Sequence, residues 1–221
     1  MTEGNENALI IFSRLPIGRE TKTRLSPLLN DTQREELHLA MWNDVFSEVF
    51  RLKRIDVFLY WTGSGDVKDY LKFIPSPFRL MEQNGVNLGE RMKNAANDIM
   101  NFGYRRAVII GSDIPSMRAE NITRVFNALN ASDAVIGPSK DGGYWLIGMN
   151  RFIPEIFDVT SWGSASVLNS TIENLKTSGL TYEFADTLND MDTPDDVTEY
   201  MKLNCNESSS TWKYLTQTAS K

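Results

Sequence analysis

Histidine and cysteine are almost absent from this chain of 221 residues, which contains one of each, His38 and Cys205. Because a single cysteine cannot form a disulfide within the chain, we expect a reducing, cytoplasmic setting. A zinc site of several histidines, or a Ser-His-Asp triad, would have to be built around His38 alone. His38 lies within a helical pattern, so we interpret it as an ordinary residue of a helix face.

Long apolar runs are missing too. The longest, such as residues 8–12, contain five residues, whereas a membrane-spanning helix needs roughly 20. The first seven residues are polar and acidic and do not have the pattern of a signal peptide. The sequence therefore predicts no membrane span.

A surplus of positive charge is also absent. Lys and Arg number 23 and Asp and Glu number 29, which gives a net charge of −6, whereas a general nucleic-acid binder needs a basic surplus. The acidity is concentrated in residues 183–199, which hold seven acidic residues and no basic one. Residues 13–25 carry the opposite charge, with four basic residues and one acidic residue. We therefore expect no nucleic-acid partner, and we expect these two segments to meet at one edge of the fold.

Short apolar runs alternate with helical patterns along most of the chain. They predict strands at 8–13, 55–61, 78–82, 106–110, 133–137, 143–149 and 181–185, and helices at 31–52, 65–73, 88–102, 119–130, 164–178 and from Pro194 onward. This alternation is typical of an α/β fold with a mostly parallel sheet covered on both faces. The strands at 133–137 and 143–149 have no crossover helix between them, so a mixed sheet is expected. We predict one domain over residues 1–203 and a loosely held polar tail over 204–221.

Ligands of open α/β sheets bind beyond the carboxyl ends of the strands. The loop after the first strand contains Gly18 and four basic residues, Arg14, Arg19, Lys22 and Arg24, which suits a polyphosphate. It is not a Walker loop, because the pattern G-x-x-x-x-G-K-S/T is absent. A solvated basic loop is the alternative interpretation.

Three aspartates are candidate metal ligands. Asp113 follows the buried strand at 106–110, where a carboxylate suits Mg²⁺ or Mn²⁺, although a turn-forming aspartate is the alternative. Asp190 and Asp192 share one face of an extended stretch and would repel each other unless a cation lay between them. The remaining acids of this segment are assigned to a helix cap (Asp195 and Asp196) or to solvent (Glu183, Asp186 and Glu199).

The Asp141-Gly142-Gly143 sequence lies between two predicted strands and has two interpretations. It is typical of a hairpin turn, and its glycines would also let a ligand approach the backbone. Asp141 is the best candidate for a general base, because no other residue stands out for that role.

Taken in order, these segments resemble a known family over about residues 8–200. They are similar to glycosyltransferase-like members of the nucleotide-diphospho-sugar transferase superfamily, which are relatives of the deazaflavin-cofactor guanylyltransferases. The matching residues are Phe12-Ser13-Arg14-Leu15-Pro16, Lys22-Thr23-Arg24-Leu25, Gln83, Gly85, Leu88-Gly89-Glu90-Arg91-Met92, Gly111-Ser112-Asp113, Pro115, Gly137-Pro138, Asp141-Gly142-Gly143-Tyr144-Trp145-Leu146, Gly148, Trp162-Gly163, Asp190-Met191-Asp192-Thr193-Pro194 and Asp196.

The resemblance implies a three-layer, Rossmann-like GT-A-type fold with a mixed sheet of about seven strands. It implies Mg²⁺ or Mn²⁺ at Asp113, Asp190 and Asp192. Its implied nucleotide and phosphate contacts are Arg14, Gly18, Lys22, Arg24, Gln83, Gly85, Leu88, Gly89 and Arg91. Its implied acceptor pocket is bordered by Gly142, Gly143, Tyr144, Trp162, Gly163, Ser164 and Ser166.

The leading hypothesis is a metal-dependent transferase that moves a group from a nucleotide sugar to a small-molecule acceptor. Lys22, Arg24, Asp113 and Asp141 would be its catalytic residues, acting mostly by positioning and charge. The first alternative is a nucleotidyltransferase of the guanylyltransferase kind, which releases pyrophosphate from a nucleoside triphosphate. The second is a non-catalytic nucleotide-binding module. A flavin or nicotinamide enzyme is disfavoured, because no G-x-G-x-x-G follows the first strand.

Overall fold

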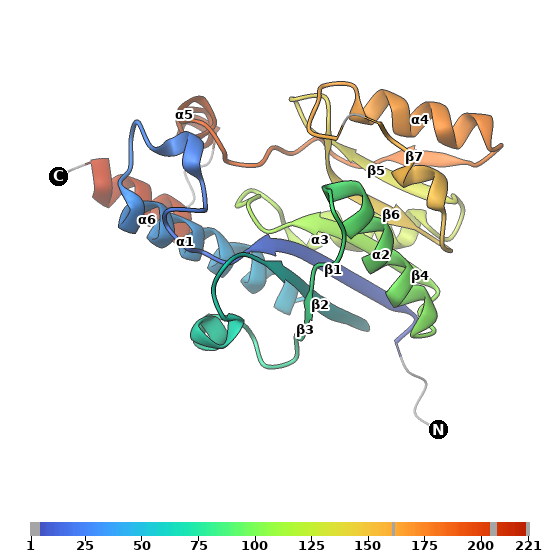
Figure 1. Cartoon of the computed structure of the whole chain (residues 1–221), viewed down its shortest axis with the longest axis horizontal. Helices are drawn as coiled ribbons and strands as arrows, with labels where there is room; N and C mark the ends of the chain where they lie inside the picture. Colours follow the sequence, from blue (N-terminus) through green and yellow to red (C-terminus); the bar gives the residue numbers. More distant parts are fainter. Residues whose placement is uncertain (1–4, 161, 204–206, 220–221) are drawn as a thin grey trace.

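The computed structural model describes residues 5–160, 162–203 and 207–219. Its seven strands form one sheet in the order β3-β2-β1-β4-β6-β5-β7 (Figure 1). Strand β6 runs antiparallel to β4 and β5, and the other neighbouring pairs are parallel. The predicted mixed, mostly parallel sheet is therefore confirmed. The strands are β1 (Asn7–Arg14), β2 (Ile55–Thr62), β3 (Arg79–Glu82), β4 (Arg106–Gly111), β5 (Ala134–Pro138), β6 (Tyr144–Met149) and β7 (Tyr182–Phe184).

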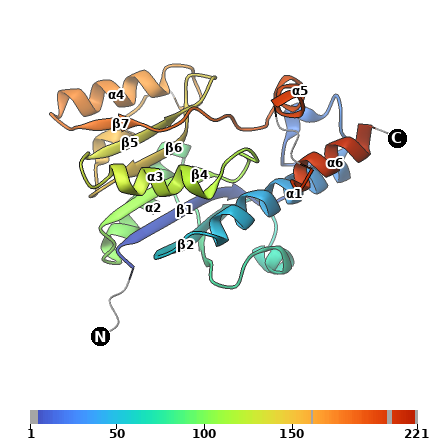
Figure 2. The same cartoon turned by 180° about the vertical axis from the view of Figure 1, so that it is seen from behind.

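Helices cover both faces of this sheet. They are α1 (Asp31–Phe50), α2 (Leu88–Asn101), α3 (Ala119–Ala128), α4 (Val167–Thr177), α5 (Pro194–Leu203) and α6 (Ser210–Ala219), with 3-10 turns η1 (Thr23–Leu25), η2 (Val67–Phe73) and η3 (Pro154–Phe157). Figure 2 shows α1 and α3 together on one face. Alternate residues of β1 explain the two layers, because Leu9 packs in the core under α1 and α3, whereas Ile10 packs in the core under α2.

A local signal sets the start of α1 at Asp31, as predicted, and the helix ends at Phe50, two residues before the predicted end. The Asn30 side chain accepts a hydrogen bond from the Gln33 amide, and the Gln33 side chain accepts one from the Asn30 amide, which makes a capping box. The apolar face of the helix, at Leu37, Met41 and Val45, is buried. Residues 67–73, predicted as part of a short helix, form the 3-10 turn η2 instead. Its Asp66 cap and the proline at 75 leave room for only two short turns.

The end of the chain differs from the prediction. The expectation of a loosely held tail is wrong for Ser210–Ala219, which form helix α6 beside α1 (Figure 2). The Asp44 carboxylate of α1 caps this helix by accepting hydrogen bonds from the Ser209 hydroxyl at 2.6 Å and from the Ser210 amide at 2.7 Å. Leu215 of α6 is buried in a third apolar cluster with Leu37 of α1. The polar composition hid this helix, because its cap comes from a residue far away in the sequence.

Two sequence expectations need separate mention. Cys205 lies outside the described residues, and the division of the chain at residue 203 stays a prediction. Among the helices that the structure describes, none combines the length and the apolar character that a membrane crossing requires.

Candidate functional site

The candidate site begins where β1 and β4 end. These strands are parallel neighbours, with Phe12 paired to Gly111, so the loops that follow them leave the same edge of the sheet. Just beyond that pair, the hydroxyl oxygens of Ser13 and Ser112 lie 2.6 Å apart. The basic loop after β1 and the Asp113 turn after β4 therefore start side by side.

Asp113, Asp190 and Asp192 come together at this edge. Each can offer one carboxylate oxygen to a set whose members all lie within 4.8 Å of one another. The Met191 amide donates to the Asp113 carbonyl at 3.0 Å, which ties the acidic segment to the turn after β4. The Asp196 carboxylate accepts from the Asp192 amide at 3.1 Å and so fixes the segment to the start of α5. An all-oxygen set of this kind could hold Mg²⁺ or Mn²⁺.

The electrostatics of this aspartate trio agree with a site for a cation. Burial raises the pKa of Asp190 to about 6, and the negative charges of Asp113 and Asp192 act in the same direction. Asp190 is partly buried, so water offsets only part of this repulsion. A positive charge beside the trio would therefore be stabilising.

Lys22 supplies one part of that charge. Its ammonium nitrogen lies 2.8 Å from Asp113 Oδ2 and 2.8 Å from Asp192 Oδ1. Burial alone would lower the pKa of Lys22, but the two carboxylates raise it above its ordinary value, so the ammonium stays charged. The backbone of Lys22 is left-handed, with φ of 48°, at the entry to η1. Lys22 was predicted to bind phosphate, and the structure instead pairs it with two of the three predicted metal ligands.

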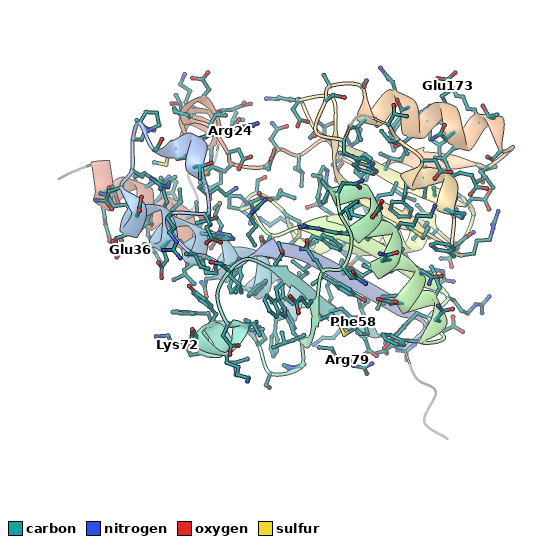
Figure 3. The ribbon with its side chains drawn as sticks, in the orientation of Figure 1. Arg24, Glu36, Phe58, Lys72, Arg79 and Glu173 are labelled. Atoms are coloured by element: carbon teal, nitrogen blue, oxygen red, sulfur yellow. The ribbon has the colours of Figure 1, made fainter. Side chains whose placement is uncertain are left out.

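A polar cavity of about 500 Å³ surrounds this ion pair, and we call it the basic-loop cavity. Its charged and titratable lining includes Arg14, Glu20, Lys22, Arg24, His38, Asp113 and Asp192. Arg14 and Arg24 are exposed, and Figure 3 shows Arg24 on the loop that precedes α1, near α5. Two exposed guanidinium groups and one buried ammonium thus line the same cavity.

His38 is a residue of this cavity that the sequence interpretation missed. It lies on α1 and is buried, with Nδ1 2.5 Å from Thr21 Oγ1 and Nε2 3.4 Å from Ser13 Oγ. Burial lowers the pKa of His38 to about 3, and the nearby Lys22 ammonium adds to this effect, so the ring is neutral. A signal was available, because His38 follows the buried Leu37 and precedes Trp42 by one helical turn. Its side chain joins α1 to the basic loop.

A second cavity, of about 240 Å³, lies on the other side of Asp113, and we call it the aromatic cavity. Its lining includes Tyr144 and Trp162, whose ring centres are 6.3 Å apart at an angle of 84°, and it shares Phe12 and Asp113 with the basic-loop cavity. A Cβ atom on Gly89 would lie 2.1 Å from Trp162 Nε1. The glycine therefore lets the indole lie against the start of α2.

The other predicted acceptor residues are divided by the structure. Gly143, Tyr144, Trp162, Gly163 and Ser164 line the aromatic cavity, and so do Asp141 and Asp190. Gly142 and Ser166 are not among its lining residues. Gly142 packs against the Ala165 backbone with φ of +86°, and Ser166 is the residue before α4. The exposed Asp141 carboxylate accepts hydrogen bonds from the Gly143 amide at 2.9 Å and from the Ser139 hydroxyl, so it also shapes the hairpin turn.

A third cavity, of about 420 Å³, contains three of the five implied nucleotide contacts that lie between residues 83 and 91. Gln83, Leu88 and Arg91 line it together with Arg14. The side-chain amide of Gln83 also donates to the Tyr60 carbonyl at 2.9 Å, and Arg91 Nε donates to the Gly85 carbonyl at 3.0 Å. These two side chains therefore hold the sheet edge and the turn before α2 in place.

Gly18 lies apart from the basic-loop cavity, although it was predicted to approach phosphate. A Cβ atom there would lie 1.9 Å from the Asp31 carbonyl oxygen, and the Gly18 carbonyl accepts a hydrogen bond from Arg34 Nε at 3.1 Å. This glycine packs the loop onto the start of α1. The acids Glu183, Asp186 and Glu199, assigned to solvent, pair at the surface with Ser132, Arg124 and Lys140.

Comparison with known proteins assigns the chain to a family. Residues 45–164, more than half of the chain, match the family described as "Uncharacterized protein conserved in bacteria" (DUF2064). The chain belongs to DUF2064. This DUF2064 chain is also 32% identical, over 135 residues, to the 2-phospho-L-lactate guanylyltransferase of Methanobrevibacter smithii. That match covers 60% of this chain and 58% of the relative, so it spans less than two thirds of the relative's length.

Solved structures confirm the fold of this DUF2064 protein. A protein of Desulfovibrio desulfuricans G20, provisionally named a nucleotide-diphospho-sugar transferase, superposes with a TM-score of 0.91. It is 32% identical, over 98% of this chain and 96% of its own. A cytidylyltransferase of Leptospira borgpetersenii superposes with a TM-score of 0.59 at 10% identity, over 99% of this chain and 95% of its own. The second likeness concerns the fold alone, and together they confirm the resemblance stated from the sequence.

Proposed function

We propose that this DUF2064 protein is a metal-dependent nucleotidyltransferase that uses a nucleoside triphosphate and releases pyrophosphate. The sequence hypothesis put a nucleotide sugar first. The similarity to an enzyme named as a guanylyltransferase supports the alternative better, because that name states a nucleotidyl transfer, whereas the sugar-transferase name of the solved structure is provisional. The acceptor is a small molecule.

The observation that carries this proposal is the meeting of Lys22 with Asp113 and Asp192 in the basic-loop cavity. A triphosphate needs several positive charges, and Arg14, Lys22 and Arg24 line one space. Asp113, Asp190 and Asp192 would hold the cation, which would neutralise phosphate oxygens. Lys22 would offset the charge that grows on the leaving pyrophosphate, because it is fixed beside Asp113, the residue shared by both cavities.

Transfer from a nucleotide sugar is the second candidate. It is favoured by the Desulfovibrio desulfuricans protein, which matches nearly the whole chain and is provisionally named a nucleotide-diphospho-sugar transferase. The same cavities would then hold a diphosphate in place of a triphosphate. The two functions differ in the leaving group, which is pyrophosphate in one and a nucleoside diphosphate in the other.

A screen of the full chain with nucleoside triphosphates and nucleotide sugars, with and without Mg²⁺, tests the proposal. We expect one triphosphate to raise the melting temperature most, and only when Mg²⁺ is present. With a pool of small-molecule acceptors, that triphosphate should yield pyrophosphate. Release of a nucleoside diphosphate from a nucleotide sugar would favour the second candidate, and binding without any product would favour the non-catalytic module.

A matched pair of variants shows whether the aspartate trio is responsible. Asp192→Asn should remove the Mg²⁺ dependence of triphosphate binding, because it removes one member of the trio. Asp195→Asn is the control, since Asp195 belongs to the same acidic segment but is exposed and lines neither cavity. Equal behaviour of the two variants would contradict the assignment of the cation to the trio.

A further inference from the structure

We infer that the acceptor of this reaction carries no phosphate group and is a neutral or cationic molecule with a hydroxyl and an apolar or ring-shaped part. This inference rests on the proposed nucleotidyl transfer and names the substrate class of its second cavity. The aromatic cavity has the required size for a small molecule, about 240 Å³, and it opens beside Asp113.

The charge of the aromatic cavity is negative. Its charged lining residues are Asp113, Asp141 and Asp190, and no lysine or arginine is found among the described residues that line it. Lys22 is already paired with Asp113 and Asp192, on the basic-loop side. With one divalent cation bound, Lys22 and the cation would together compensate three of the four negative charges of these aspartates. A phosphorylated acceptor would bring further negative charge toward this wall, and like charges side by side are strongly unfavourable.

A helix N-terminus is the other feature that could attract a phosphate, and α4 begins beside the cavity at Val167. Two amides at the start of this helix are already used. The Val167 amide donates to the Ser164 carbonyl at 3.3 Å, and the Leu168 amide donates to the Gly142 carbonyl at 3.0 Å. The Ser166 amide donates to Ser164 Oγ at 3.4 Å. An anion at this end of α4 would have to displace these hydrogen bonds.

Most of the remaining lining of the cavity is apolar, apart from Ser139 and Ser164. Tyr144 and Trp162 stand nearly perpendicular, and Phe12, Leu88 and Met92 complete the wall. Perpendicular aromatic walls favour a ring or an apolar chain, which gains by leaving water. Apart from the cation of the aspartate trio, which the triphosphate would already bind, a phosphate group would gain no cationic partner there to replace its hydration. The shape and the charge of the cavity therefore select the same class of acceptor.

The reaction with such an acceptor is balanced by the groups at hand. The hydroxyl oxygen of the acceptor forms the new bond to the α-phosphorus of the triphosphate. The bond from that phosphorus to the bridging oxygen breaks, and pyrophosphate leaves with the electron pair. The hydroxyl proton passes to the Asp141 carboxylate, which lines the aromatic cavity, and from there to water, because Asp141 is exposed.

Matched probes that differ by one phosphate test this inference by binding. Benzyl alcohol is compared with benzyl phosphate, and glucose with glucose 6-phosphate, on the full chain with Mg²⁺ by ligand-observed nuclear magnetic resonance. We expect the neutral member of at least one pair to bind more tightly by about tenfold or more. Equal or tighter binding of the phosphorylated member in every pair would overturn the inference, and so would the absence of binding by all four probes.

A charge variant tests whether the preference for the neutral probe arises in the aromatic cavity. Asp141→Asn removes one negative charge and keeps an oxygen that can accept from the Gly143 amide, so the preference for the neutral probe should shrink. Asp195→Asn is the control and should leave it unchanged. Triphosphate binding is measured in the same samples without probes. Its absence, with the neutral preference retained, would contradict the proposed function but leave the charge selection of the cavity intact.

Discussion

The two cavities that share Phe12 and Asp113 differ in almost every other respect. The basic-loop cavity is about 500 Å³, and its polar side chains are held in ion pairs and hydrogen bonds around Lys22 and His38. The aromatic cavity is about 240 Å³ and combines ring faces with carboxylates. Asp113 thus borders two different environments, which supports the assignment of an anionic donor to one side and a neutral or cationic acceptor to the other.

The largest effect is expected from Lys22, the charge that holds the basic-loop cavity together. Lys22→Met leaves Asp113 and Asp192 facing each other without the ammonium, so the free energy of unfolding should fall by roughly 2 kcal/mol, since both carboxylates are partly exposed. Mg²⁺ should restore more stability to the variant than it adds to the wild type, because the cation would take the place of the ammonium. Urea unfolding with and without MgCl₂ measures both effects.

Lys213→Met is the matched control for this experiment. Lys213 is exposed on α6, far along the chain from the aspartate trio, and its loss should change the free energy of unfolding by less than about 0.5 kcal/mol. If Mg²⁺ stabilises the wild type and Lys22→Met equally, Lys22 and the cation do not compete for the same carboxylates.

His38 gives the basic-loop cavity a pH dependence of a defined sign. Its pKa is lowered from 6.5 to about 3 by burial, so below pH 6.5 the unfolded chain takes up a proton that the folded chain refuses. Stability contributed by neutral His38 is therefore lost as the pH falls through this range, at about 1.4 kcal/mol per pH unit. The measurement is the difference in unfolding free energy between wild type and His38→Gln from pH 7 to 5. A difference that does not vary with pH would show that His38 is not protected from protonation.

Lys22 and His38 also show which contacts the sequence does not predict. The carboxyl ends of β1 and β4, at Arg14 and Gly111, are predictable to within one residue, because each strand is a short apolar run followed by a polar turn. The grouping of Asp113 with Asp190 and Asp192 follows from the resemblance and from the rule that ligands bind at strand ends.

The sequence does not predict contacts that form only when segments far apart in the chain pack together. Lys22 reaches the aspartates from a left-handed backbone, with φ of 48°, which is not encoded in a residue pattern. His38 meets Thr21 because Arg34 and Gly18 pack the loop onto α1. Helix α6 depends on Asp44, which is 165 residues from Ser209 in the sequence. Each of these contacts is long-range, and apart from the place of His38 on the buried face of α1, none has a local signature.

Asp190 lines the aromatic cavity, beside the shared residue Asp113, and should make cation binding pH-dependent. Burial raises the pKa of Asp190 from 3.8 to about 6. Without metal, the stability that protonated Asp190 contributes is fully present below pH 3.8 and is lost as the pH rises through 6. This pH dependence has the opposite sign to that of His38. A cation requires the ionised carboxylate, so Mg²⁺ affinity should fall by about tenfold per pH unit below 6. Calorimetric titration of Mg²⁺ between pH 5 and 7 measures this. Asp190→Asn should bind Mg²⁺ weakly at every pH, whereas Asp195→Asn should keep the pH dependence of the wild type. A wild-type Mg²⁺ affinity that does not change with pH would contradict the role of Asp190.

The smallest change in stability is expected from Gly89, and it separates the two cavities most cleanly. In Gly89→Ala the new methyl group would lie 2.1 Å from Trp162 Nε1, so the indole must move and the aromatic cavity must change shape. The gain in helix propensity, about 1 kcal/mol, offsets part of the strain, so the protein should unfold at nearly the same urea concentration. Benzyl alcohol should then bind several-fold more weakly, while the affinity for triphosphate with Mg²⁺ should change much less, because Trp162 does not line the basic-loop cavity. An equal loss of both affinities would mean that the two cavities act as one site, and the division of donor and acceptor between them would have to be abandoned.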